Sequence, residues 1–272
     1  MGVYITPDTV RRTIGLDTTQ ISDTDIDSFI TEIESLVPKF FNTVFTMTEK
    51  IDVLDGDGSD RVVLDSNPVW AVRELISDTV TEVPANLYVY GEGGRVNLST
   101  SSIISRFPNK RNIIRVRYLY GKLDKTTTQT KTTISSIVGS PITLSVASST
   151  GFVATDWVYI KGMDGNYEAT QISSVGTGTI TVDQLVYTHL SGSIITKLAV
   201  SPNFTRIMNV LASIAVLGKM IGSSASAESA YSLGELNVTL QAPNVLWKET
   251  YNMFISERDE LYKRIKIRPA VV

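Results

Sequence analysis

The stretch that organises the chain begins with the nine residues IIRVRYLYG (113–121) and ends with a segment that opens as SPNF (201–204). Residues 113–121 are rich in β-branched and aromatic side chains and stop at a glycine, which predicts a β-strand. Ser201 and Pro202 are favoured at the N-cap and first position of a helix, so we predict a helix that continues to Gly222. We expect this strand and helix to belong together, with the residues between them as an insertion.

The residues between the strand and the helix differ in composition from the rest of the chain. From Thr126 to about Leu198, Thr, Ser, Val, Ile and Gly dominate, and charges are sparse. Short apolar runs alternate there with turn signals such as Gly176-Thr177-Gly178, a pattern typical of a small barrel or sandwich. We therefore predict an inserted all-β domain at 122–199 and a discontinuous core formed by 1–121 and 200–272.

The core is expected to combine helices with a meander of short strands. Ser22 begins a helical pattern of apolar residues, and a glycine-rich turn at Asp55–Asp60 separates two strand candidates. The predicted fold class is thus α+β: a helical bundle with short antiparallel strands, plus the inserted small all-β barrel or sandwich. The helix after Ser201 is apolar over much of its circumference and must be covered on more than one side. A neighbouring subunit is one source of that cover, with Phe204, Val210, Leu217 and Ile221 as candidate interface residues.

Composition excludes several classes of protein. The 272 residues are 42% hydrophobic, which indicates a globular chain, and the net charge of −3 argues against a protein that grips nucleic acid. Because cysteine is absent, the chain has neither disulfides nor thiolate metal sites. The N-terminal residues lack a basic region followed by an apolar run, so we expect no signal peptide. Polar residues interrupt the longest apolar helix, and we expect no membrane span.

The motifs that could carry chemistry are weak. The single histidine, His189, has no obvious partners for a metal site or a catalytic triad. Asp55–Asp60 alternates oxygen ligands as a calcium loop does, but its twelfth position is Ser66, so a hairpin turn is favoured. Gly91–Arg95 lacks the ending of a phosphate loop and is also favoured as a turn. We therefore predict no catalytic residue, no metal, no cofactor and no enzymatic activity.

A group of aromatic residues in the predicted insertion leaves two interpretations open. Such rings can stack on sugars or bases, or they can form the core of a small β domain, which is favoured here. The residues are Trp157, Tyr159, Tyr167 and Tyr187.

Several features together, taken in order, resemble the head–tail connector (adaptor) family of tailed bacteriophages. An N-terminal helical pair with apolar residues from Ile26 to Ile33 precedes a glycine-rich turn and an Asn67-Pro68-Val69 step. The Tyr-x-x-Gly corner at 118–121 follows, and then the Pro-initiated helix, the SLGELNV stretch (232–238) and a final amphipathic helix. The resemblance covers roughly the residues outside 122–199, and the order of the features rather than any one motif carries it.

This resemblance implies a structural virion protein in the neck, between capsid and tail, assembled in the host cytoplasm. It implies a homo-oligomeric ring, usually of twelve copies, that docks beneath the portal protein and extends the DNA channel without sequence-specific DNA binding or membrane contact. The ring would be the platform for a downstream neck, stopper or tail protein. By analogy with the family, the portal contact falls on the C-terminal residues Lys263, Arg264, Lys266, Arg268, Pro269, Ala270, Val271 and Val272.

The alternative function is that of another neck or tail structural protein. In that case the β insertion would be a module that binds a glycan or another protein.

Overall fold

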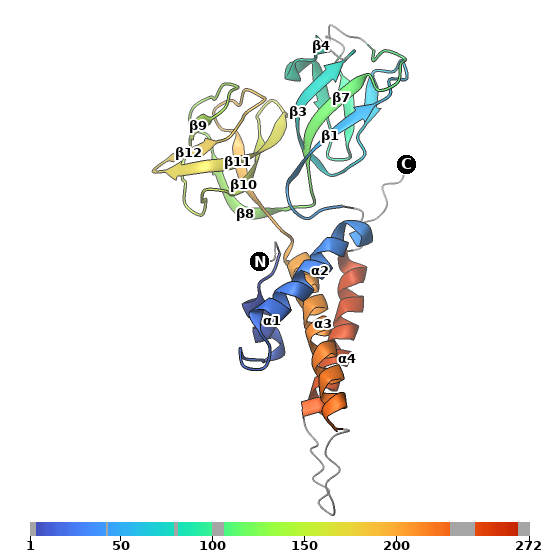
Figure 1. Cartoon of the computed structure of the whole chain (residues 1–272). Coiled ribbons are helices and arrows are strands. Elements are labelled where there is room, and N and C mark those ends of the chain that lie inside the picture. Colours follow the sequence, from blue (N-terminus) through green and yellow to red (C-terminus); the bar gives the residue numbers. More distant parts are fainter. Residues whose placement is uncertain (1–3, 42, 79–80, 100–105, 229–242, 266–272) are drawn as a thin grey trace, which may run out of the picture. The chain divides into compact units, whose positions relative to one another are not determined.

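Figure 1 shows the computed structural model, which describes residues 4–41, 43–78, 81–99, 106–228 and 243–265. The chain divides into two compact units, one formed by Met1–Asn42 with Ser201–Val272 and the other by Thr43–Val200. The described residues of the first unit form α-helices, and those of the second form mainly β-strands. The two ends of the chain therefore share one unit, and the strand-rich unit lies between them in the sequence.

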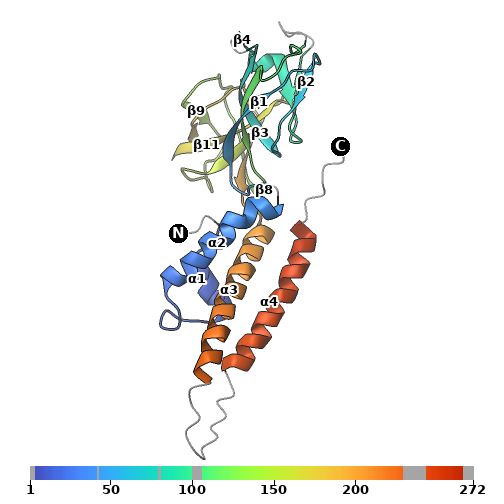
Figure 2. The same ribbon diagram turned by 45° about the vertical axis from the view of Figure 1, so that its right-hand side comes forward.

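The helical unit contains α1 (Pro7–Ile14), α2 (Asp23–Phe41), α3 (Pro202–Glu228) and α4 (Pro243–Ile265). Local signals set the starts of the first two helices: Thr6 Oγ1 accepts the Thr9 N–H at the start of α1, and Ser22 Oγ accepts the Asp25 N–H at the start of α2. α3 packs against α1, α2 and α4, and Figure 2 shows α3 and α4 side by side.

In the β unit, residues before Gly121 form two antiparallel sheets. One has the order β1-β7-β3-β4 and the other the order β2-β6-β5. Buried side chains from both sheets share one core, which includes Val62, Val72, Tyr88, Val96 and Val116. We call these two sheets and their shared core the sandwich. The strands are β1 (Thr48–Leu54), β2 (Arg61–Val63), β3 (Val69–Ser77), β4 (Thr81–Glu82), β5 (Tyr88–Tyr90), β6 (Arg95–Leu98) and β7 (Ile114–Tyr120). A short 3-10 helix, Ala85–Leu87, precedes β5.

Residues after Gly121 form a six-stranded antiparallel sheet with the order β8-β13-β10-β11-β12-β9. Its two edges meet, because Thr132 and Val146 form a β-bridge and the Ala147 N–H donates to the Lys131 carbonyl at 2.9 Å. The sheet thereby closes around its own apolar core, as in a small barrel. The strands are β8 (Asp124–Lys131), β9 (Ile142–Ser145), β10 (Trp157–Lys161), β11 (Tyr167–Gly176), β12 (Thr179–Val182) and β13 (Ile194–Ala199).

The chain passes from the sandwich to the barrel at Gly121, a position that only glycine fits. Its φ is +143°, and a Cβ there would lie 2.1 Å from the Thr46 carbonyl oxygen. The Gly121 carbonyl accepts the indole N–H of Trp70 on β3. The glycine of the Tyr-x-x-Gly corner therefore permits close backbone packing at the start of the barrel.

The predicted fold class is wrong. The described residues are mostly β-structure, arranged in sheets of four, six and three strands, and they form four α-helices rather than a helical bundle that dominates the fold. The physical reason is that the strands before Gly121 are not short additions to a helical core. They bury a sandwich core of their own, separate from the apolar face of α3.

Other sequence predictions concern smaller segments. The strand predicted at 72–80 is found as β3 at Val69–Ser77. The strand predicted at 232–240 lies outside the described residues, and the predicted domain boundaries at 121/122 and 199/200 stay a prediction. Among the described residues, no helix is both long enough and apolar enough to cross a membrane.

Candidate functional site

The predicted portal-contact residues fall almost entirely outside the described part of the chain. Lys263 and Arg264 lie in the last turn of α4, where the backbone alone is described, and residues 266–272 are not described. The portal-contact assignment therefore stays a prediction.

The predicted subunit-interface residues lie on α3. Phe204, Val210 and Leu217 have no exposed surface, because the neighbouring helices cover them. Phe204 packs edge-on against Tyr4, with ring centroids 4.9 Å apart. Ile221 is in α3, but its side chain is not described. The wide apolar surface of α3 is thus used largely within the chain, and the interface assignment stays a prediction.

Polar contacts join α3 to both ends of the chain. The Asn209 amide donates to Thr13 Oγ1 at 2.5 Å, and Lys219 Nζ lies 2.7 Å from Asp25 Oδ1. Toward α4, the Arg206 guanidinium makes two hydrogen bonds with the Glu257 carboxylate, at 2.6 and 2.9 Å. These contacts fix which face of α3 meets each neighbouring helix.

The aromatic residues of the barrel are not a free stacking surface. Tyr159 and Tyr187 are buried, and the Tyr159 ring packs edge-on against Trp70 of β3 at a centroid distance of 5.8 Å. Tyr167 packs against Tyr90 of β5 at 5.1 Å, and each hydroxyl of this pair donates to the backbone carbonyl of the other residue. The rings therefore join the barrel to the sandwich.

A lysine adds to this aromatic contact between the barrel and the sandwich, which we call the aromatic joint. Lys125 Nζ lies 3.9 Å from the centre of the Tyr159 ring and 5.5 Å from that of Trp70, a cation–π geometry. The same ammonium lies 3.2 Å from Glu92 Oε1. The joint is thus held by apolar, cation–π and ionic contacts together.

Beside the aromatic joint lies a buried ionic centre, formed by Arg73 of β3 and Glu168 of β11. Their closest atoms, Arg73 Nη1 and Glu168 Oε2, are 3.5 Å apart, and Glu168 has no exposed surface. Arg73 also donates to the carbonyls of Ala169 at 2.9 Å and Gln184 at 3.3 Å. Burial lowers the pKa of the Arg73 guanidinium, and the Glu168 carboxylate opposes that effect. An arginine of the sandwich is therefore bound to the barrel through three of its residues.

The single histidine belongs to the same centre. Glu168 accepts hydrogen bonds from the Val186 and Tyr187 N–H groups, both at 2.9 Å, and from His189 Nε2 at 3.0 Å. Because a carboxylate only accepts, Nε2 carries the proton in this contact. Both oxygens of Glu168 are occupied, so the carboxylate is not free to act as a base toward a bound molecule.

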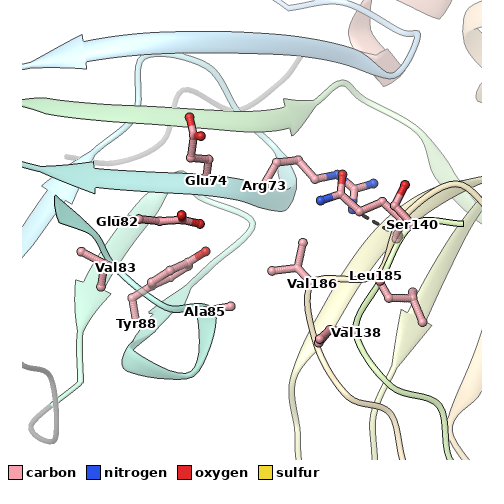
Figure 3. Close-up of a pocket in the computed structure, with 12 residues that line it drawn as sticks. Arg73, Glu74, Glu82, Val83, Ala85, Tyr88, Val138, Ser140, Leu185 and Val186 are labelled. Atoms are coloured by element: carbon pink, nitrogen blue, oxygen red, sulfur yellow. Dashed lines mark hydrogen bonds between the residues drawn. The ribbon is translucent and has the colours of Figure 1, made fainter. Parts of the chain in front are cut away.

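A pocket of about 370 Å³ lies beside Arg73, and Figure 3 shows side chains of the sandwich facing loops of the barrel across it. Its polar groups are largely engaged within the chain: Glu74 pairs with Arg115 at 3.0 Å, and Ser140 Oγ donates to the Asp183 carbonyl at 2.6 Å. Burial raises the pKa of the Tyr88 hydroxyl at its edge well above the usual value.

A second buried polar centre lies within the sandwich. The Asp52 carboxylate accepts hydrogen bonds from the Tyr118 hydroxyl at 2.7 Å and from the Asp65 N–H at 3.0 Å, and Lys50 Nζ lies 2.9 Å away. Burial raises the pKa of Asp52, but these donors outweigh it, so the net pKa lies below the ordinary value. Burial and the bond to Asp52 raise the pKa of Tyr118 to about 12.

The glycine- and aspartate-rich turn at Asp55–Asp60 is tied to a neighbouring loop. The Gly56 N–H donates to the Lys110 carbonyl, and Asp55 Oδ1 accepts the Asn112 N–H at 2.7 Å. Asp57 Oδ1 accepts the Ser59 N–H within the turn. The carboxylates thus organise loops, and the described residues contain no group of metal-binding side chains that includes them.

Sequence reasoning did not identify the Arg73–Glu168 centre. The available signal was a charged residue within the apolar run from Val69 to Ile76, because a charge inside a buried strand must find a partner. The arrangement joins two β layers. Comparison of the sequence with protein-family models and with curated proteins found no match.

Proposed function

We propose that the chain is a structural virion protein, a head–tail connector (adaptor) that assembles as a ring beneath the portal, extends the DNA channel and receives the next neck or tail protein. Its role is assembly rather than catalysis. The proposal starts from the order of sequence features described above.

The observation that carries the proposal is the packing of both chain ends around α3. The resemblance expects the N-terminal helical pair, the Pro-initiated helix and the final helix to belong to one core, together with the strands before Gly121. Contacts of α3 with Thr13 and Asp25 on one side and with Glu257 on the other support the helical part of that expectation. The ionic centre around Glu168 adds support, because both carboxylate oxygens accept hydrogen bonds within the chain and Arg73 joins the centre to the second β layer.

The test is binding to the portal protein of the same virus. The purified chain is mixed with portal rings, and the complex is examined by sedimentation and electron microscopy. A closed ring of the chain on one end of the portal is the expected result. A chain that never associates with portal, alone or during co-expression, would overturn the proposal.

The tail assignment is tested in the same assay. A chain lacking Arg268–Val272 should keep its circular dichroism spectrum and its melting temperature but lose portal binding. Normal binding of this shortened chain would refute the C-terminal contact while leaving the connector proposal intact.

A further inference from the structure

One edge strand of the sandwich is long and regular, and the described residues leave its outer side without a partner strand. β1 (Thr48–Leu54) is the outer strand of the four-stranded sheet and pairs with β7 alone among the described strands (Figure 1). The pairing of its seven residues with β7 runs without a register shift. Because backbone N–H and C=O groups point alternately to the two sides of a strand, every second residue of β1 directs these groups away from the sheet.

The other sheet edges within the described residues are short, buried or closed. On the opposite side of the same sheet, β3 is buried along most of its length and pairs with β4, which has two residues. β2 and β5, the edges of the three-stranded sheet, have three residues each. The two outer strands of the barrel sheet meet at the Thr132–Val146 bridge. β1 therefore offers the longest row of outward backbone groups.

The exposed face of β1 is apolar beside this row. Ile51 and Val53 are 53% and 54% exposed, and as alternate residues of one strand they point to the same side of the sheet. Both are β-branched, the type of residue that strands favour. Proteins usually blunt a long edge strand with a proline, a bulge or a charge, and the exposed centre of β1 carries none of these.

The opposite face of β1 carries charges that are engaged within the sandwich. Lys50 Nζ lies 2.9 Å from Asp52 Oδ1 and 3.5 Å from Asp65 Oδ2, and it donates to Ser66 Oγ at 3.2 Å. A lysine on an edge strand discourages a further strand when its charge has no counterion. The charge of Lys50 is balanced within the chain, so it does not close this edge.

The chemistry of the edge selects a polypeptide strand as its partner. Outward N–H and C=O groups recur at every second residue, about 7 Å apart, and another extended backbone matches that spacing. A lipid surface or a glycan does not repeat donors and acceptors in this way. Addition of a strand to an exposed sheet edge is a common mode of protein recognition.

The sequence of β1 is complementary to itself in one antiparallel register. With Ile51 opposite Ile51 of a second copy, Lys50 lies opposite Asp52 of that copy, and Glu49 lies opposite its Val53. Opposite charges and apolar pairs across two strands are favourable, whereas like charges directly opposite are destabilising. A register centred on Lys50 or on Asp52 would place like charges opposite each other. Apolar side chains and charges therefore favour the register centred on Ile51.

We infer that β1 pairs antiparallel with β1 of a second copy of this chain, so that two four-stranded sheets join across a two-fold axis. The inference goes beyond the proposed function and does not rest on it. A two-fold contact closes with two copies, whereas a ring needs a contact that repeats from head to tail. Edge pairing uses the seven residues of β1 from each copy, fewer than the roughly 20–30 of a stable interface, so we expect a weak dimer.

The test traps this pair with a disulfide in the full chain, which has no cysteine of its own. In the inferred register, the two Cα atoms at position 51 are about 4.5–5.5 Å apart, within the range that a disulfide spans. Under oxidising conditions, Ile51→Cys should form a dimer of two 29.8 kDa chains at least about 10-fold faster than the control. Val63→Cys is the matched control, because Val63 is 60% exposed on the short edge strand β2.

A mixture of two further variants tests the register. Glu49→Cys and Val53→Cys should crosslink to each other, because these positions lie opposite in the inferred pair. Neither variant should crosslink to itself, since equal positions are then about 14 Å apart along the strands. Copies with tags of different size distinguish the mixed dimer from the two self-dimers on a gel.

An unmodified interface is tested by sedimentation velocity of the cysteine-free chain. Ile51→Lys places two ammonium groups opposite each other and should shift the association midpoint about 10-fold toward higher concentration, whereas Val63→Lys should leave it unchanged. Both side chains are more than half exposed, so the melting temperatures of these variants should equal that of the wild type.

Three results would overturn the inference. The first is Ile51→Cys crosslinking no faster than Val63→Cys. The second is self-crosslinking of Glu49→Cys at the rate of the mixed pair, which would mean that the copies meet without a fixed register. The third is an Ile51→Cys chain that crosslinks to a different protein during co-expression and not to itself, which would assign this edge to another partner.

Discussion

Removal of the Arg73 side chain should strongly destabilise the β unit. Replacement of Arg73 by methionine keeps an aliphatic side chain of similar length but leaves Glu168 buried without its cation. Removing one partner of a buried ion pair typically costs about 3–5 kcal/mol, because the remaining charge is uncompensated. The carbonyls of Ala169 and Gln184 lose their donor as well, which places the expected loss within that range.

The magnitude can be read from urea unfolding. With a urea dependence of about 2 kcal/mol per molar, the predicted loss moves the midpoint down by roughly 1.5–2.5 M. Two of the three tryptophans, Trp70 and Trp157, lie in the β unit, and the third, Trp247, lies in α4. A Trp247→Phe background therefore lets fluorescence report on the β unit alone.

A double-mutant cycle isolates the pair itself. Glu168→Gln alone leaves Arg73 as an unpaired buried cation, whereas the double variant leaves neither charge. The double variant should therefore lose about 1–3 kcal/mol less than the sum of the two single losses. Arg117→Met is the matched control, because Arg117 is partly exposed and its ion pair with Glu49 is long, at 3.8 Å.

Two results would refute this account of the joint. One is an Arg73→Met midpoint within the range of the Arg117→Met control. The other is strict additivity in the cycle, which would mean that Arg73 and Glu168 act independently.

Three further predictions follow from the same unit. Because the pKa of Asp52 is depressed in the folded chain, its contribution to the free energy of unfolding is present above about pH 4 and is lost as the pH falls. In a plot of the urea midpoint against pH, Asp52→Asn should therefore flatten the acid limb. An unchanged acid limb would contradict this prediction. Burial raises the pKa of Tyr90 and Tyr187, so their contribution to the free energy of unfolding is present below about pH 10 and is lost above it. An absorbance titration should show the ionisation of these two hydroxyls only as the β unit unfolds. Gly121→Ala should cost about 2–4 kcal/mol in urea unfolding, whereas Gly91→Ala, with open space around its Cα, should be neutral; equal effects would refute the close-packing argument.

Features with local causes could be predicted from the sequence. The side chains of Thr6 and Ser22 accept hydrogen bonds from N–H groups only three residues ahead, so the starts of α1 and α2 follow from a few neighbouring residues. The strand ending at Gly121 and the strands of the barrel are likewise marked by short-range composition and turns.

The arrangement of those strands could not be predicted, because it depends on distant partners. β3 is buried along most of its length, with Val72 in the sandwich core and Trp70 and Arg73 against the barrel. The sequence marks Arg73 only as a charge within an apolar run and gives no sign of its partner, Glu168, which lies 95 residues away. The same ambiguity made Tyr159 a candidate for a surface platform, although it packs at the joint.

The chain's path also determines the order in which its parts can form. α1 and α2 are synthesised first, yet the α3 contacts at Asn209 and Lys219 arrive 196 and 194 residues after their partners. Met47 and Val200, near the two ends of the β unit, pack against the same cluster around Trp70. A β unit that folds first therefore brings the two halves of the helical unit together. This reduces an entropic loop-closure cost by about 2 kcal/mol relative to an unfolded connection of that length. Loss of the β unit would thus weaken the helical unit without altering any contact between helices.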